Sequence, residues 1–143
     1  MSSHHPIREG KITCSDCHNP HGTSTEKLIS ADNINTKCFE CHAEKRGPLI
    51  HQHPPVAEGC LNCHKPHGSN HNKLLTQRSP FLCQTCHSRS SGHGMSSLHA
   101  LTDAQTALNV NSAGVTRLIN KGCVNCHVQI HGSNHPSGQY LTR

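Results

Sequence analysis

The sequence predicts a fold with little regular secondary structure, built mostly of short α-helices and loops and without a β-sheet. Only 31% of the 143 residues are hydrophobic, Trp is absent, and the aromatic residues are Phe39, Phe81 and Tyr140. A core of large apolar side chains cannot form from this composition. Eight Pro and 11 Gly interrupt most segments. Ten Cys and 16 His indicate that a bound group replaces the missing apolar mass.

The cysteines identify that group. All ten fall into five C-x-x-C pairs, and a histidine directly follows each pair. C-x-x-C-H is the attachment signature of c-type haem, because the two thiols reach the two vinyl groups of one porphyrin and the adjacent imidazole binds the iron. The predicted attachment residues are Cys14, Cys17, Cys38, Cys41, Cys60, Cys63, Cys83, Cys86, Cys123 and Cys126. The predicted proximal ligands are His18, His42, His64, His87 and His127.

Three other uses of C-x-x-C pairs fit less well. Four-cysteine zinc sites would leave one pair over and would not explain the histidines. A disulfide scaffold does not require five identical spacings, and a thioredoxin-like motif is single and lies in a βαβ pattern, which is absent here. We therefore expect five covalently bound haems c in a row, around which the chain wraps and which form its core.

The motifs divide one pentahaem domain, residues 1–143, into repeats. His-Pro precedes the first and third motifs and Pro-His-Gly follows them. This repeat predicts a dihaem module over 5–42, a second over 53–87, a connector over 88–122 and a single-haem module over 123–143. We expect short helical turns at each motif. The apolar spacing between Leu98 and Lys121 predicts an amphipathic helix that covers a haem face.

Eleven further histidines could supply the second axial ligand of each iron. His5 and His53 occupy matching positions before a motif, His21 and His67 share the pattern C-x-x-C-H-x-x-H-G, and His131 has one extra residue in that pattern. We predict these five as distal ligands, with His93 and His99 in the connector as further candidates. Because the only Met residues are Met1 and Met95, bis-His, low-spin ligation is expected.

Charge, hydropathy and the first residues limit the cellular location and the kinds of partner that we expect. The formal net charge is +5, but the basic residues are scattered, so nucleic-acid binding is not expected. No apolar run is long enough for a membrane span, and the first residues do not form a signal peptide. Since haem c is attached outside the cytoplasm, we expect a periplasmic protein, with an outer-membrane-associated or extracellular location as the alternative.

The flanking residues carry a family resemblance. The segments HHPIREGKITCSDCHNPHG, HPPVAEGCLNCHKPHGSNH and CVNCHVQIHGSNHPSG resemble the decahaem cytochromes of the DmsE/MtrA type, of which this chain would form about half. They are also similar to the pentahaem electron donor of periplasmic nitrite reductase. The resemblance implies a periplasmic electron carrier whose partners are donor and acceptor cytochromes or a reductase, with an outer-membrane porin as a further partner.

The predicted function is electron transfer along a wire of bis-His haems, without catalysis. A multihaem reductase of nitrite or hydroxylamine is an alternative, but it needs an iron with an open position, and all five motifs here end in His. A subunit of an extracellular cytochrome filament is a second alternative, in which a histidine of one subunit would ligate a haem of the next.

Overall fold

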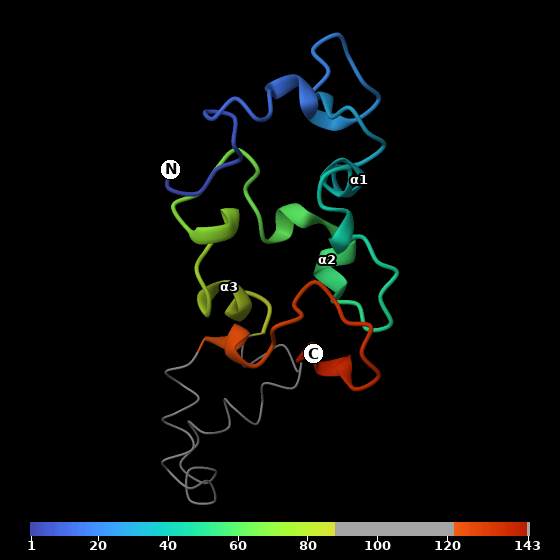
Figure 1. Cartoon of the computed structure of the whole chain (residues 1–143), viewed down its shortest axis with the longest axis vertical. Helices are drawn as coiled ribbons and strands as arrows, with labels where there is room; N and C mark the ends of the chain where they lie inside the picture. Colours follow the sequence, from blue (N-terminus) through green and yellow to red (C-terminus); the bar gives the residue numbers. More distant parts are fainter. Residues whose placement is uncertain (88–121, 143) are drawn as a thin grey trace, which may run out of the picture. The chain divides into compact units, whose positions relative to one another are not determined.

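The computed structural model describes residues 1–87 and 122–142 (Figure 1). By its internal contacts the chain divides into one compact unit of Met1–Gln77 with His127–Arg143 and a second of Arg78–Cys126. Each unit is described by itself. The predicted helix between Leu98 and Lys121 and the candidate ligands His93 and His99 lie outside the described residues.

The described helices are short. The first unit contains α1 (Ile34–Phe39) and α2 (Pro54–Glu58), and the second contains α3 (Phe81–Gln84). The side chain of Asn33 caps α1 by accepting a hydrogen bond from the Thr36 N–H at 2.8 Å. Two prolines occupy the first turn of α2, where no N–H is needed, and Gly59 ends it.

Single-turn 3-10 helices make up most of the remaining regular structure. In the first unit they are η1 (Cys14–Asp16), η2 (Glu26–Leu28), η3 (Ala43–Lys45), η4 (Cys60–Asn62), η5 (Asn72–Leu74) and η8 (Gly138–Tyr140), and in the second η7 (Cys123–Asn125). Over the described residues there is no strand, only isolated β-bridges. The predicted fold class of short helices and loops without a sheet is thereby confirmed.

A helical turn lies at every C-x-x-C-H motif. The first motif of each module begins a 3-10 turn, at η1, η4 and η7, whereas the second motifs lie on α1 and α3. In four motifs the histidine N–H donates to the carbonyl of the first cysteine, at 2.8–3.0 Å. This i to i−4 bond closes the turn that places two thiols and one imidazole on the same side of the chain.

The described part of the chain buries no hydrophobic side chain. The buried polar residues there are Ser69 and Ser133, which are 6% and 4% exposed. Large apolar side chains such as Ile50 and Phe81 are 69% and 58% exposed. This part of the chain thus supplies no apolar core of its own, as the composition predicts, and its packing must come from a group that the side chains surround.

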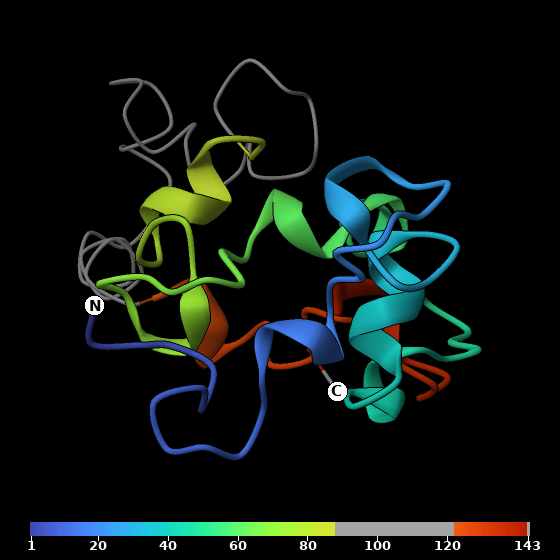
Figure 2. The same ribbon diagram turned by 90° about the horizontal axis from the view of Figure 1, so that it is seen from above.

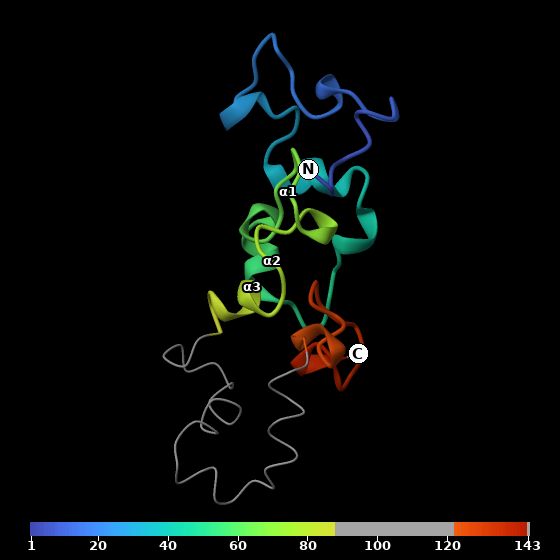
Figure 3. The same cartoon turned by 90° about the vertical axis from the view of Figure 1, so that its left-hand side faces the viewer.

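The residues just before each dihaem module contact the module that follows it. We call these residues, around Ser3 and around His51, the N-terminal arms. Ser3 and Ser69 exchange two main-chain hydrogen bonds of 2.9 and 2.8 Å, and so do His51 and Ser133. Figures 1 and 2 show the blue N-terminal arm beside the yellow-green segment of the second module. In Figures 1 and 3 the teal segment before α2 reaches the red C-terminal segment in the same way.

Candidate haem-binding site

Three predicted proximal histidines are held in one orientation by the main chain. The Nδ1–H groups of His18, His64 and His127 donate to the carbonyls of Lys27, Lys73 and Tyr140, at 2.7, 2.8 and 2.6 Å. A ring that donates through Nδ1 has its lone pair on Nε2, which is the nitrogen a metal then binds. In each of these three imidazoles the main chain therefore occupies Nδ1 and leaves the lone pair on Nε2.

An unusual backbone conformation delivers two of these carbonyls. Lys27 and Leu28 have positive φ values of 59° and 58°, and Lys73 and Leu74 repeat them at 59° each. Such values cost a non-glycine residue about 1–2 kcal/mol. The turn directs the carbonyl of Lys27 to His18 and that of Leu28 to the N–H of Asn19, at 2.8 Å. Strain of this kind concentrates at functional sites.

The third module reaches the same arrangement with a longer loop. Here Leu141 has a φ of 57° and accepts a 2.9 Å hydrogen bond from the N–H of Gln129, while the preceding Tyr140 carbonyl accepts from His127. Tyr140–Leu141 therefore takes the place of the Lys-Leu pair of the first two modules. Sequence reasoning missed these carbonyl acceptors, although the repeated Lys-Leu pair was visible.

Two predicted distal histidines show the same Nδ1 pattern. His5 donates to the carbonyl of Pro66 at 2.7 Å, and His53 donates to that of Ile130 at 3.0 Å. Both acceptors lie in the module that follows the donor. Donation through Nδ1 places the lone pair of each neutral ring on Nε2, as in the proximal histidines.

Three pairs of imidazoles face each other at a spacing that suits one iron between them. The ring centres are 5.9 Å apart for His18 and His67, 6.2 Å for His64 and His131, and 6.4 Å for His5 and His42. Two metal–nitrogen bonds of about 2 Å, with each nitrogen about 1.1 Å from its ring centre, predict about 6.3 Å. The three observed ring-centre distances lie close to this value.

The pairs join different parts of the chain. His67, in the second module, faces the proximal histidine of the first, and His131, in the third module, faces that of the second. His5 instead faces His42, the second proximal histidine of its own module. The structure thus brings together three distal candidates with three proximal ones, and two of these pairs cross from one module to the next.

Four other histidines of the described residues show no such ring pair. The imidazole of His21 is exposed and has no ring or hydrogen-bond partner among the described residues. At His135 the N–H of Ser137 donates to Nδ1 at 3.2 Å, which puts the proton of a neutral ring on Nε2 and disfavours ligation. His4 bonds its neighbour's carbonyl and lies 3.8 Å from Glu9, and the buried Nε2 of His51 has no hydrogen-bond partner.

Burial and charge favour a neutral ring at His131. Burial is the largest cause that lowers its pKa below the ordinary value, and the nearby Lys45 cation and the His64 ring add to it. The two planes of His64 and His131 lie within 11° of parallel. Because a metal ligand must be neutral, the surroundings of His131 suit that role.

Cysteines of neighbouring motifs also lie together. Burial, followed by the adjacent Cys60 thiol, raises the pKa of Cys38 to about 11. In the second unit, burial and the neighbouring Cys83 raise the pKa of Cys123 in the same way. Since attachment of haem converts these thiols into thioethers, the finding that matters is their proximity. The last motif of one module and the first motif of the next meet at their first cysteines.

Polar contacts hold this junction in place in the first unit. Asn35 of α1 accepts a 2.8 Å hydrogen bond from the N–H of Cys60 and donates to the carbonyl of Ala57 at 3.1 Å.

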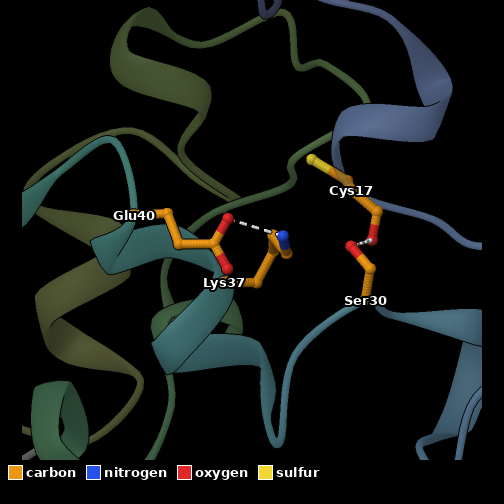
Figure 4. A network of polar contacts seen from close by, with 4 residues as sticks. All are labelled: Cys17, Ser30, Lys37 and Glu40. Carbon is orange, nitrogen blue, oxygen red and sulfur yellow. Dashed lines mark hydrogen bonds and ion pairs between the residues drawn. The ribbon is translucent and has the colours of Figure 1, made fainter.

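Further polar contacts lie around Cys17 of the first motif. Figure 4 shows Lys37 in its 2.6 Å ion pair with Glu40, near Cys17. It also shows Ser30, whose hydroxyl donates to the Cys17 carbonyl at 3.2 Å.

The comparisons with known proteins agree with this site. The family model of the doubled CXXCH motif matches residues 4–47 and 53–92, and such paired motifs hold covalently bound haem c. The multihaem cytochrome MtrA of Shewanella baltica (strain OS185) is 50% identical over 141 residues, which cover 99% of this chain and 41% of that protein. The chain thus spans about two fifths of the length of this relative.

Within the described residues, no helix has both the length and the apolar character that crossing a membrane requires. The paired motifs, the short-helix fold and the identity along the whole chain lead to one conclusion: the protein belongs to the multihaem c-type cytochromes of the MtrA family.

Proposed function

We propose that the chain is an electron carrier of the cell envelope that holds five haems c, each with two histidine ligands, and that it is not an enzyme. When bound, each haem iron supplies a one-electron redox centre. The observation that carries the proposal is the set of three imidazole pairs with ring centres 5.9–6.4 Å apart. The five C-x-x-C-H motifs supply the count of five.

The histidines would both hold and close the sites. The main-chain carbonyls that accept from Nδ1 of His18, His64 and His127 leave Nε2 as the nitrogen that would bind the iron. The facing rings of His67 and His131 would bind the iron together with His18 and His64 and would leave no room there for a substrate. Closed coordination of this kind suits electron transfer and opposes nitrite or hydroxylamine reduction.

The cysteine contacts support a continuous path. Cys38 lies beside Cys60, and Cys83 beside Cys123, so the attachment points of consecutive haems belonging to different modules are adjacent. The side chain of Asn35 fixes the first of these junctions. The chain thereby keeps neighbouring redox centres close without a large apolar core of its own.

The expected partners are redox proteins, a donor and an acceptor cytochrome or a reductase, and an outer-membrane porin is a further candidate. The location we propose is the periplasm, because covalent attachment of haem c occurs after export. Electron-transfer partners commonly meet through small, weak interfaces. The 50% identical relative is named a multihaem cytochrome, which supports the redox role.

The test is spectroscopic. The holoprotein, produced with the haem-attachment machinery, is analysed for haem content, and its ferric form is examined by visible and EPR spectroscopy. We expect five haems per chain, all low-spin, and no spectral change with cyanide or nitric oxide. Fewer than five haems, or high-spin iron that binds either ligand in the wild-type protein, would contradict the proposal and favour a reductase.

A further inference from the structure

Two residues of opposite charge follow the second haem-attachment motif directly. Glu44 and Lys45 lie on η3, and the N–H of Lys45 donates to the carbonyl of His42 at 3.0 Å, which holds this turn against the motif. Oε1 of Glu44 lies 3.9 Å from Nδ1 of His42 and 3.9 Å from Nζ of Lys45. A carboxylate thus lies beside a predicted proximal ligand, with an ammonium group next to it.

His42 differs in this respect from the three proximal histidines that the main chain holds. In each of those three, Nδ1 donates to a neutral peptide carbonyl. Among the described residues no main-chain carbonyl accepts from Nδ1 of His42, and the carboxylate of Glu44 lies near it instead. A negative charge beyond Nδ1 makes an imidazole a stronger donor to a metal. It would stabilise ferric iron bound to His42 and so lower the reduction potential of that haem.

Lys45 belongs to the surroundings of the next haem site. Lys45 and His131 line the same cavity, which has a volume of about 370 Å³, and the ring of His131 faces that of His64. After burial, the Lys45 cation is the largest cause that lowers the pKa of His131, while Glu44 acts in the opposite sense and more weakly. The positive charge therefore dominates at this ligand. Because ferric iron carries one more positive charge than ferrous iron, a nearby cation raises the reduction potential.

The two haem sites are consecutive along the chain and meet at a fixed junction. Asn35 of α1 accepts from the N–H of Cys60 at 2.8 Å, and α1 carries Cys38, the first cysteine of the second motif. The haem ligated by His42 and the haem ligated by His64 would therefore be neighbours in the row. The two charges of η3 lie one at each of these sites.

We propose that Glu44 and Lys45 set a step in reduction potential between these two haems, with the lower potential at His42 and the higher at His64. The inference rests on the proposed function, since it assumes a haem at both motifs. One electron would then pass favourably from the ferrous haem at His42, which is oxidised, to the ferric haem at His64, which is reduced. No proton or other atom is transferred in this step.

The two side chains remain open to solvent. Those of Glu44 and Lys45 are 60% and 44% exposed, and salt screens charges at such positions. The step should therefore be largest at low ionic strength and should shrink as salt is added. This dependence separates an effect of the two charges from an effect of haem shape or ligand identity.

The experiment first gives each of the two haems its own spectrum. His5→Ala should leave the haem at His42 high-spin, and His131→Ala should do the same for the haem at His64, since each removes the ring opposite the proximal histidine. A potentiometric titration followed at the high-spin absorbance of the holoprotein then reports the potential of that haem alone. If neither variant produces high-spin haem, the ligand pairs are wrong and the inference is overturned.

The charge variants are then added to these two chains. In His5→Ala, Glu44→Gln should raise the potential of the high-spin haem, and in His131→Ala, Lys45→Gln should lower it. The double variant Glu44→Lys with Lys45→Glu keeps the net charge and should move the two potentials in the same directions by larger amounts. Glu26→Gln and Lys11→Gln remove one charge each from exposed side chains without an ion pair among the described residues, and should leave the difference between the two potentials unchanged.

The results that overturn the inference leave the proposed function intact. Potentials that do not move in Glu44→Gln and Lys45→Gln at low ionic strength overturn it, and so does a double variant that leaves the difference between the two haems as in the wild type. Shifts that persist unchanged at high salt also overturn it, because they do not arise from the charges. A wild-type chain without five low-spin haems would instead refute the proposed function.

Discussion

Each module contains a loop with a His-Gly pair, at Pro20–Thr23, Pro66–Ser69 and Ile130–Ser133. Residues before the preceding module's first motif cover the second and third of these loops but not the first. Alanine at Gly132 and at Gly22 therefore provides a matched measure of how strongly the modules stabilise each other. Gly132 and Gly22 have φ values of 127° and 119°, a range that side chains rarely adopt. Both Gly132→Ala and Gly22→Ala should therefore pay about 1–3 kcal/mol of backbone strain. That cost is common to the two variants and cancels when their free energies of unfolding are compared.

The difference between the variants comes from the arm. A Cβ on Gly132 would lie 2.9 Å from the carbonyl oxygen of His51 and against the side chain of Leu49, so the arm must move away. That movement breaks the two hydrogen bonds between His51 and Ser133, of 2.9 and 2.8 Å. At about 1 kcal/mol each, Gly132→Ala should lose about 2 kcal/mol more stability than Gly22→Ala.

The assay is guanidinium unfolding of each holoprotein, followed by the Soret absorbance, at a concentration where the chain is monomeric. Gly68→Ala should fall between the two, because its nearest main-chain atom, the Ser3 carbonyl oxygen, is 3.2 Å away and the rest of its contact is with the flexible side chain of Met1. Equal losses at Gly22 and Gly132 would refute the reasoning, since the arms would then contribute no stability.

Three further predictions test the site. His67→Ala should leave one haem per chain high-spin and able to bind cyanide, and removal of the attachment cysteines before His18 should abolish that binding; persistence would place His67 on another haem. Asn35→Ala should lower the free energy of unfolding by about 2 kcal/mol, because two hydrogen bonds across the Cys60 junction are lost, and an unchanged unfolding midpoint would contradict this. Chain produced without haem attachment should show no cooperative unfolding transition, since the described residues bury no hydrophobic side chain; a sharp transition in the haem-free chain would show that it has a core of its own.

The attachment residues could be predicted from the sequence because their chemistry is local. Two thiols and one imidazole within five consecutive positions specify a haem site whatever the rest of the fold does. The short helical turns at the motifs and the missing apolar core followed from the same composition, and the structure confirms both over the described residues.

The pairing of distal with proximal histidines could not be predicted in this way. His67 stands three residues after His64, and this spacing suggests that both histidines ligate the same haem. Its ring nevertheless faces His18, 49 positions away in the first module. Likewise His21 has the same sequence pattern as His67, yet among the described residues only His67 has a ring opposite it. Spacing along the chain identifies the type of ligand, whereas the partner depends on how modules are arranged in space.

The carbonyls that accept from the proximal histidines could not be predicted from the sequence either. Lys27 and Leu28 are residues that normally avoid positive φ, so nothing in their chemistry signals the left-handed turn that orients His18. The turn becomes visible only because Lys73 and Leu74 repeat it in the second module with the same hydrogen bond. Repetition within the chain here takes the place of residue preference as evidence that the conformation is functional.

Ring contacts between histidines of different modules explain how the described part of the chain, which buries no hydrophobic side chain, can be held together. If each module ligated only its own haems, neighbouring modules would be joined only by a few hydrogen bonds. Instead, His67 and His131 each lie on the module after the proximal histidine that they face. His5 and His53 likewise bond to carbonyls of the module after their own. A repeat whose ligands come from its neighbours is incomplete alone, and the stability of such an array resides in its interfaces. In this protein those interfaces would be metal–ligand bonds, which are stronger than the side-chain contacts that they replace.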